Sequence, residues 1–580
     1  MADPTNKRER GMALLMALFF IGIALLVTGL LASRAMQQRK VVEQYGDVSA
    51  AQLGADAALA AAWVELESGG DGIIGMDGWK PQWDDDNNFL MPDLDADGVT
   101  PRTMPSKEDV EYAAYSVDWA ADERDNNGDG SVDDPSETRM YTVYAIGRNG
   151  AVTRELEVVC QAKKVGVWEN AVFAGPGVLG GLINGSINAR GSVHLLGDNL
   201  LGGVLGLTSS LGLGGGNQVR NYYQGIPNEL RNRIPNLPET VVAGETVETL
   251  GAEFRARNGV IGLAGGSTLG DAQAFGNGVK ETLDGVFVTG GWIGDAVTPD
   301  GDRGDPQNVF SDNGWDALYD LADRVVFPLL GGAWRNPIGG EPQQNPDTGA
   351  PYTHGEYFRE VLVGAADDPD DGQYTGNVTI DARGDHFYWN ATTGEQRQGS
   401  LPTVAPPKTD DYILFDKTRD VLDINGQIAI DGNLTITGRG NEKTINYTGR
   451  GAILVDGNVR LDANLLTCNK GNPADSVMSF PVKNVLGIMA TENITIGSSL
   501  LDLVFNSKLK LMGAFYAEKQ VVSLKQAQVA GTLVSNQFNL GLTAPDVFQV
   551  PTLGDNLPEG MVGDVPVTAL KQISWRERDL

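Results

Sequence analysis

The residues best suited to chemistry form an acidic tract with the spacing of a calcium loop. Between Asp84 and Glu137 the chain has 17 acidic and three basic residues, and such a density repels itself unless a cation lies among the carboxylates. Within this tract, residues 125–133 read Asp-Asn-Asn-Gly-Asp-Gly-Ser-Val-Asp. Oxygen ligands alternate, a glycine makes the sharp turn and an apolar residue stands eighth. The predicted Ca²⁺ ligands are Asp125, Asn127, Asp129, Ser131, Asp133 and Glu137.

This loop departs from the calcium-loop motif at its twelfth position. A bidentate glutamate is expected there, but the chain has Ser136 followed by Glu137. The departure weakens the predicted affinity or moves the last ligand to a neighbouring carboxylate. Flanking segments 110–119 and 140–146 are strand-like, which predicts a lone structural loop in a sheet rather than a helix-loop-helix sensor. Segments 140–146 and 151–160, with turn residues Gly-Arg-Asn-Gly at 147–150 between them, predict a hairpin.

A second tract, residues 93–98, repeats the first half of the same pattern. Its predicted ligands are Asp93, Asp95 and Asp97, before Pro101 ends the match. The alternative interpretation of both tracts is an acidic surface loop that holds no ion.

Residues suited to catalysis are scarce. None of the three histidines, His194, His354 and His386, lies in a zinc or nucleophile motif, so each is interpreted as a surface or satisfied residue. Carboxylates such as Asp381 and Asp385, and the pair at 367–368, have no spacing that separates them from solvated loops. We therefore predict no catalytic residue, no organic cofactor site and no enzymatic activity.

The elements that must carry these loops begin with an apolar N-terminal segment. Residues 11–33 contain no charge and follow a charged leader, Lys-Arg-Glu-Arg, at 7–10. About 20 apolar residues suffice to span a bilayer, so this stretch predicts a transmembrane helix. Because Ala32-Ser33 runs straight into Arg34, no signal-peptidase site follows it cleanly.

The predicted helix continues beyond the membrane. Residues 41–67 contain no proline, and an alanine-rich apolar stripe recurs at helical spacing. The predicted members of this stripe are Leu53, Ala57, Ala60, Ala61 and Val64. The glycines at 69–70 then predict the helix end. A single helix over 12–68 would be about 85 Å long, at 1.5 Å per residue.

The leader Lys-Arg-Glu-Arg-Gly, followed by Met-Ala-Leu-Leu-Met-Ala-Leu-Phe-Phe, resembles a class III (prepilin) signal. Residues 7–67 as a whole resemble the PilX-type minor pilins of type IV pili. The resemblance implies that prepilin peptidase cuts between Gly11 and Met12. It also implies a single-pass precursor in the inner membrane, with its bulk in the periplasm, that joins other pilin and minor pilin subunits through the helix.

One position departs from the major pilins. Those proteins carry a glutamate as the fifth residue of the mature chain, and this sequence has Met16. An intramembrane charge is costly unless it is paired, so its absence suits a subunit at a filament tip or in an initiating complex. The alternative for the N-terminus is an ordinary single-span anchor.

Composition favours an exported, extended protein. The formal net charge is −32, with 76 acidic against 44 basic residues, so no nucleic-acid partner is expected. The 75 glycines among 580 residues have no collagen period and predict many tight turns. Cys160 and Cys468 lack the spacing of a metal site, and whether they pair in an oxidising compartment stays open.

The remaining chain predicts a mainly β architecture. Short Gly-Asn strand units recur from residue 167, and stacking such units in a right-handed parallel β-helix would give them a shared core. A β-sandwich is the alternative. The segment 316–326 reads as an amphipathic helix ended by Pro328.

The predicted fold class is α+β. The predicted organisation is a leader (1–11), a membrane-spanning and pilin-type helix (12–68), an acidic β head with Ca²⁺ loops (69–165), a first β-solenoid part (166–302), an insertion with helices and loops (303–415) and a C-terminal β-solenoid part (416–580).

The resulting functional hypothesis is a non-enzymatic minor pilin or pseudopilin. It would stand at the tip of a type IV pilus-like filament on the cell surface, for filament assembly or for adhesion to a host or polysaccharide surface. The alternative function is a membrane-tethered β-helix protein that binds or cleaves polysaccharide.

Overall fold

The computed structural model describes most of residues 5–578. It leaves out 69, 77–78, 84–88, 97, 120–121, 123–139, 178–182, 186, 198–208, 214–216, 273–277, 295–307, 316, 335–342, 364–371, 439–442, 499–507, 542 and 564–566. In the N-terminal helix it also leaves out the side chains of 5–27, 29–32, 35 and 43.

The chain is mostly β with one long N-terminal helix, and it divides into two compact units. The first unit comprises Met1–Lys164 and Val567–Leu580, and the second comprises Val165–Pro566. The polypeptide therefore leaves the first unit once and returns to it for its last residues.

Helix α1 (Thr5–Glu67) has 63 residues. It ends where the glycines predict, because the amide of Gly70 donates to the carbonyl of Glu65 at 2.9 Å and the Ser68 hydroxyl donates to the carbonyl of Val64 at 2.7 Å. Among the described residues, no helix is both long enough and apolar enough to cross a membrane. The side chains of most of the charge-free stretch 11–33, including Gly11 and Met12, lie outside the described residues.

A five-stranded sheet forms the rest of the first unit. Its order is β3 (Arg102–Met104), β4 (Lys107–Asp118), β5 (Met140–Asn149), β6 (Val152–Val165) and β35 (Val567–Arg578). A separate antiparallel pair joins β1 (Gln82–Trp83) to β2 (Phe89–Leu90).

The predicted hairpin in this sheet is confirmed as the antiparallel pair β5–β6, but its turn lies at Gly150–Ala151, since Asn149 is opposite Val152. Gly147 and Arg148, which the sequence analysis placed in the turn, belong to strand β5.

The predicted boundary of the C-terminal β part is wrong at its end. Residues 567–578, predicted to end the second β part, instead form edge strand β35 of the first unit's sheet. Cross-strand ion pairs fix it there, with Arg576 Nη2 2.8 Å from Glu157 Oε2 and Arg154 Nη1 3.2 Å from Glu577 Oε1. A single-sequence pattern cannot reveal such pairing between strands 400 residues apart.

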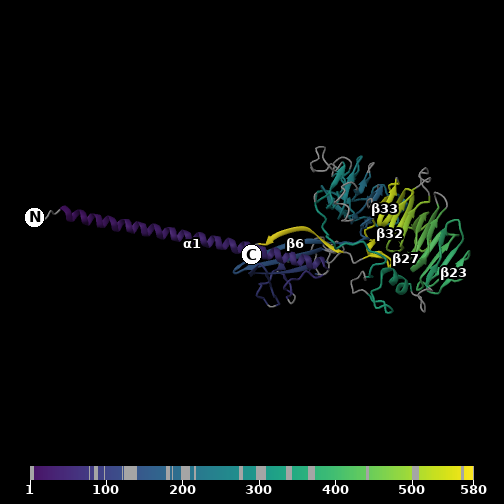
Figure 1. The fold of residues 1–580 in the computed structure, drawn as a ribbon, viewed down its shortest axis with the longest axis horizontal. Coiled ribbons are helices and arrows are strands. Elements are labelled where there is room, and N and C mark those ends of the chain that lie inside the picture. The colour runs from purple at the N-terminus through teal and green to yellow at the C-terminus, as the bar shows by residue number, and fades with distance from the viewer. Residues whose placement is uncertain are drawn as a thin grey trace. The chain divides into compact units, whose positions relative to one another are not determined.

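The second unit is built on three ladders of parallel strands. Figure 1 shows β27, β32 and β33 side by side within them. The first ladder runs β25 (Val421–Asp431), β27 (Thr444–Val455), β30 (Val485–Ala490), β32 (Leu509–Ser523), β33 (Ala527–Gly541), β7 (Val172–Ala174), β10 (Val193–Leu195), β15 (Glu253–Ala256) and β18 (Gly285–Val288).

The second ladder runs β21 (Val378–Asp381), β26 (Leu434–Thr437), β28 (Val459–Asp462), β31 (Asn493–Ile496), then the later halves of β32 and β33, β8 (Ile183–Gly185), β11 (Ser209–Leu213), β16 (Val260–Leu263) and β19 (Trp292–Gly294). The third runs from the start of β27 through β29 (Asn464–Thr467), the earlier halves of β32 and β33, β34 (Asp546–Phe548), β9 (Asn188–Arg190) and β12 (Gln218–Arg220) to β17 (Thr268–Leu269).

Spatial order and chain order differ in these ladders. The last strands of the unit in sequence, β33 and β34, pair with its first strands, β7–β9, in the middle of the stack. Leu533 lies opposite Val172, and Val547 lies opposite Ala189. From β7 to β19, successive strands of the sequence therefore lie progressively farther from the middle of the stack, toward one end. The next strand, β20 (Gln373–Thr375), lies at the opposite end, and the strands after it lie progressively closer to the middle. The ladders resume inside the predicted insertion 303–415, not after it.

Recurring Gly-Asn units have a common structural role. Asn377 Oδ1 accepts from the backbone amide and the side-chain amide of Asn433, both at 2.9 Å, and Asn433 Oδ1 accepts from the amide of Asn458 at 2.9 Å. Asn493 Nδ2 then donates to Asn458 Oδ1 at 3.0 Å. The asparagine of each successive unit stacks on the previous one, which explains why the residue recurs with the strand.

Antiparallel and helical elements complete the unit. Strands β22 (Phe387–Asn390), β23 (Glu395–Gln398) and β24 (Tyr412–Asp416) pair antiparallel beside β25, and β13 (Glu239–Val242) pairs with β14 (Glu245–Glu248). The helical elements are α3 (Asn228–Arg231), α4 (His354–Tyr357), the π-helical turn η2 (Phe358–Leu362) and the 3₁₀ turn η4 (Gly554–Asn556).

The predicted helix at 316–326 is wrong, since residues 320–325 form bends and turns and the other described residues of the segment have no regular structure. Arg255 forms a two-bond ion pair with Asp320, at 2.8 and 2.9 Å, and Tyr319 Oη lies 2.8 Å from His194 Nε2. These tertiary contacts outweigh a weak local helical preference.

Candidate assembly interface and cation sites

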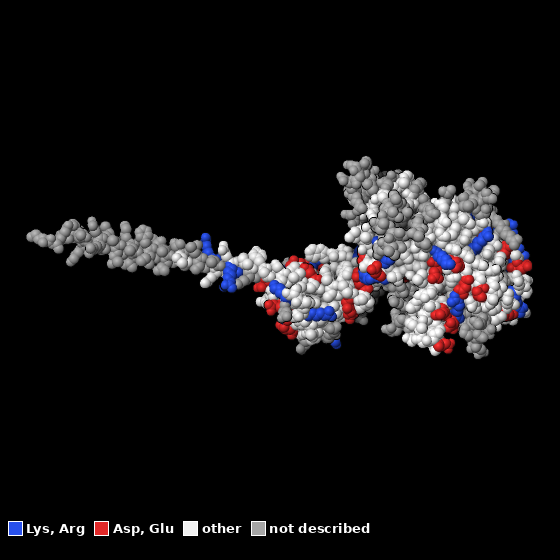
Figure 2. All heavy atoms as spheres, in the orientation of Figure 1, with Lys and Arg blue, Asp and Glu red and all other residues white. Residues whose placement is uncertain are grey.

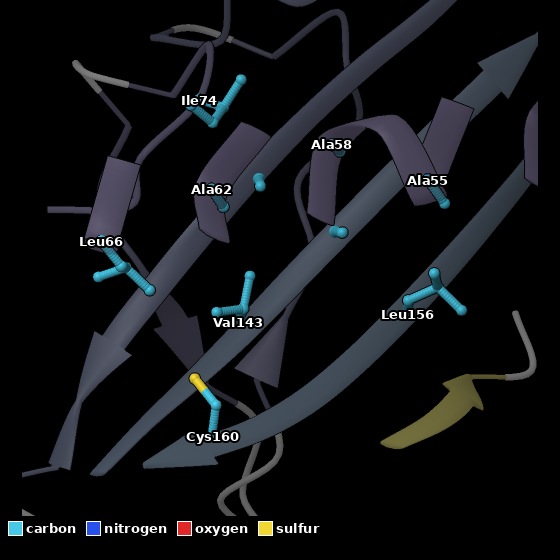
Figure 3. Packing of buried hydrophobic residues seen from close by; sticks show 10 residues of the cluster. Ala55, Ala58, Ala62, Leu66, Ile74, Val143, Leu156 and Cys160 are labelled. Carbon is cyan, nitrogen blue, oxygen red and sulfur yellow. The ribbon is translucent and has the colours of Figure 1, made fainter. Parts of the chain in front are cut away.

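One face of helix α1 packs on the sheet of the first unit. Its buried stripe consists of Ala51, Ala55, Ala58, Ala62 and Leu66. Figure 3 shows the last four of these above Val143, Leu156 and Cys160 of strands β5 and β6. Small side chains on the helix let its backbone lie close to the strands.

Helix and sheet approach each other closely at two glycines. A Cβ added to Gly147 of β5 would lie 2.2 Å from the carbonyl oxygen of Ala51 and 2.2 Å from the backbone nitrogen of Ala55. A Cβ added to Gly54 would lie 2.9 Å from Val110 Cγ1 and 3.1 Å from Gly147 Cα. Both obstacles at Gly147 are backbone atoms, so neither can rotate away.

The opposite face of the helix carries an exposed apolar stripe. Val42, Leu53 and Val64 are 69%, 49% and 65% exposed. They recur every 11 residues, which is close to three helical turns, so they lie along one line with steps of about 16 Å. The predicted stripe of Leu53, Ala57, Ala60, Ala61 and Val64 therefore belongs largely to this outer face, and the buried face is the neighbouring alanine row.

The described carboxylates of the second predicted calcium tract are engaged by an arginine. Arg148 donates to both oxygens of Asp95 at 2.8 Å, to Asp93 Oδ1 at 3.2 Å, and from Nε to Glu111 Oε2 at 2.8 Å. The hydrogen bonds from Arg148 lower the pKa of Asp95. An ion at this tract would have to displace the guanidinium.

Several predicted calcium ligands lie outside the described residues, namely Asp97 and all six of the first loop, Asp125, Asn127, Asp129, Ser131, Asp133 and Glu137. Among the residues that are described, no cluster of three or more His, Cys, Asp or Glu side chains is arranged to hold a metal ion. The pairing of β4 with β5 places Arg148 opposite Glu111. The spacing of residues along the sequence does not reveal this register, so the role of Arg148 could not be predicted from the sequence.

His194 and His354 are buried, and His386 is half-buried. His194 is fully buried beside Tyr319, and burial together with the charges of Arg255 and Arg257 holds its pKa well below the usual value. His386 Nδ1 accepts from the backbone amide of Lys417 at 3.2 Å. Both cysteines are free and buried, Cys160 in the first unit and Cys468 in the second. Burial raises the pKa of Cys160 to about 12 and that of Cys468 to about 11.

The candidate carboxylates for polysaccharide chemistry are not placed together by any described contact. Asp381 is buried, whereas Asp385 is exposed and lies 3.9 Å from Lys417 Nζ. Asp367 and Asp368 lie outside the described residues.

Comparisons with known proteins give a likeness to solved structures. No family model and no curated protein matches the chain. The crystal structure of the competence-associated pilin ComZ from Thermus thermophilus aligns over 92% of this chain and 97% of that chain, with 16% identity and a TM-score of 0.44. Values at that level do not establish a shared fold.

The glycine contact predicts opposite effects for two glycine-to-alanine substitutions. Gly147→Ala is expected to lower the stability of the first unit by about 1–3 kcal/mol or more, because its Cβ meets immovable helix backbone. Gly46→Ala is expected to stabilise the helix by about 1 kcal/mol, since a Cβ there meets nothing within 4 Å. Hydrogen exchange of the β4–β6 amides in the full chain measures both. Equal protection in Gly147→Ala and the wild type would refute the close packing.

Proposed function

We propose that this chain is a non-enzymatic, pilin-like subunit of a type IV pilus-like filament, and that it assembles through helix α1. The observation that carries the proposal is that helix α1 has two apolar faces on opposite sides. Its inner alanine row packs on the sheet over residues 51–66, and Leu53 and Val64 are exposed on the opposite side of that segment. Val42 continues their line where the described side chains of the helix are exposed on every side. A helix that served only as a tether would have no need of a second, aligned apolar face.

The leader supports the same proposal. A charged segment at 7–10, Gly11 and then a long charge-free run are the features that a prepilin peptidase needs to cut before Met12. In this proposal the precursor lies in the inner membrane, its bulk is periplasmic, and the mature chain moves into the filament on the cell surface. Met16, in place of a glutamate, favours a tip or initiating position, where no carboxylate must be paired within lipid.

The second unit then forms the part that projects from the filament. Three ladders of parallel strands support a parallel β-solenoid over a β-sandwich, whose sheets are antiparallel. We propose a right-handed coil with an adhesive or filament-initiating role.

Two neighbouring valines test the assembly face. Val42 lies on the outer stripe, whereas Val41, which is 48% exposed, lies about 100° around the helix. Val42→Glu is expected to reduce incorporation into sheared filaments at least tenfold, because it places a charge in the helix contact, and Val41→Glu is expected to reduce it far less. Quantitative immunoblotting of filament and membrane fractions measures the effect. Equal incorporation of the two variants, or absence of the wild-type chain from filaments, would contradict the assignment.

We also propose that the loop 125–137 binds a structural Ca²⁺ ion. Titration of the full chain with Ca²⁺ by calorimetry is expected to give a binding heat that Asp129→Ala abolishes, because Asp129 is the fifth-position ligand of the motif. Asp385→Ala removes the same charge from an exposed position in the second unit and serves as the control. The same heat in the Asp129→Ala variant as in the wild type would remove the site. The Asp93–Asp97 tract stays a prediction, with Arg148 as the competing cation.

A further inference from the structure

The second unit has a cleft of about 780 Å³ beside strands β25 and β27. Its described lining combines four cations with two acids and several neutral hydrogen-bonding groups. They are Lys408, Arg419, Lys470, Lys483, Asp423, Asp475, Thr448, Gly449, Asn469, Gly471, Asn484 and Val421. The volume falls within the range of small-molecule sites, about 300–1,000 Å³.

Two of the four cations are already paired. Lys408 Nζ lies 3.1 Å from Asp423 Oδ1, and Arg419 Nε donates to Asp416 Oδ2 at 2.6 Å. Burial disfavours the charged form of Lys408, but its hydrogen bond to Tyr412 and the charge of Asp423 outweigh that effect and raise its pKa. Lys408 therefore stays charged, and both side chains are held by neighbouring carboxylates.

The other two cations, Lys470 and Lys483, are exposed and form no ion pair with any described residue. In a chain of net charge −32, two unpaired lysines on one cleft are unexpected. On the visible face of the second unit, by contrast, acidic and basic side chains lie next to one another (Figure 2). The cleft thus has surplus positive charge to offer a ligand.

The backbone at Lys470 gives an independent reason to look for a ligand here. Lys470 has φ of 50° and Gly471 has φ of 67°, so both residues occupy the left-handed region. Glycine or asparagine would adopt that conformation at lower cost, and such strain concentrates at binding sites. An added Cβ at Gly471 would make only ordinary contacts, at 3.5 Å from Arg419 Nη1 and 3.8 Å from Thr448 Cγ2, so the backbone conformation and not a lack of space favours glycine there.

The neutral part of the lining is held rigidly. Asn484 Oδ1 accepts from the Gly449 amide at 2.8 Å and from the Thr448 hydroxyl at 3.1 Å, and Asn484 Nδ2 donates to the Ser479 carbonyl at 3.0 Å. Asn469 is buried and donates to Asp475 at 2.9 Å, and its Oδ1 has no hydrogen-bond partner among the described residues. These amides and carboxylates suit hydroxyl-rich ligands, which both donate and accept.

We propose that this cleft binds an acidic saccharide, with a ligand carboxylate between Lys470 and Lys483 and its hydroxyls on Asp423, Asp475 and Asn469. A uronate unit carries both chemistries, a single negative charge and several hydroxyls. Nucleic acid fits less well, because Asp423 and Asp475 would repel its phosphates and no aromatic side chain lines the described part of the cleft for base stacking. The proposal is independent of filament assembly, which depends on the first unit.

Calorimetry with the full chain tests the site, with an oligogalacturonate as the probe. Binding is expected in the wild type, with affinity that falls as salt rises. The double substitution Lys470→Gln with Lys483→Gln is expected to weaken it at least tenfold. The control, Lys443→Gln with Lys519→Gln, removes the same charge from lysines paired with Asp420 and Glu492, and is expected to retain binding.

Further probes separate the ligand classes. A neutral maltooligosaccharide of the same length is expected not to bind, and neither is a double-stranded DNA oligomer. Failure of the wild type to bind oligogalacturonate, equal binding by both double variants, or equal binding of the neutral oligosaccharide or the DNA would overturn the proposal. None of these results bears on assembly through helix α1.

Discussion

The contact between Gly147 and the backbone of helix α1 sets the geometry on which the rest of the first unit depends. With a would-be Cβ only 2.2 Å from two helix backbone atoms, helix and strand can approach this closely only with glycine at that point. The alanine row then buries against β5 and β6, and the rotation of the helix about its own axis is fixed. Because that rotation is fixed, Leu53 and Val64 must face away from the sheet, and Val42 lies on the same line of the helix. The proposed assembly face therefore follows from the packing of the opposite side.

The second unit depends on a different constraint, the closure of its ladders by strands far apart in sequence. Strands β7–β9 and β33–β34 are separated by more than 300 residues and pair in register in the middle of the stack. Because the chain enters and leaves near this join, Trp168 Nε1 donates to the carbonyl of Val562 at 2.8 Å and Thr532 Oγ1 donates to that of Asn170 at 2.7 Å. Folding of the unit therefore needs both ends of residues 165–566. Its outer strands need only their sequence neighbours.

Patterns of neighbouring residues predicted the local features of this chain, but not the features that depend on contacts between residues far apart in the sequence. The end of α1 at the glycines, the β5–β6 hairpin and the recurring Gly-Asn strands follow from capping, turn chemistry and repeated spacing. The alanine row that packs on the sheet was not predicted, because alanines occur on both sides of the helix and only the position of Gly147 in the sheet distinguishes them. The same limit applies to β35, which was assigned to the wrong unit, and to Arg148, whose three partners come from two separate segments. The cleft at Lys470 and Lys483 gave no sequence signal at all, since its lining spans residues 408–484.

The account as a whole requires that the charged leader be removed while the apolar helix stays attached to the folded units. Intact-mass and N-terminal peptide analysis of the chain isolated from its own membranes and filaments measures this directly. The account predicts a mature chain that begins at Met12 and retains residues 12–33. A chain that still carries its first residues, or one that begins beyond Ser33, would contradict it.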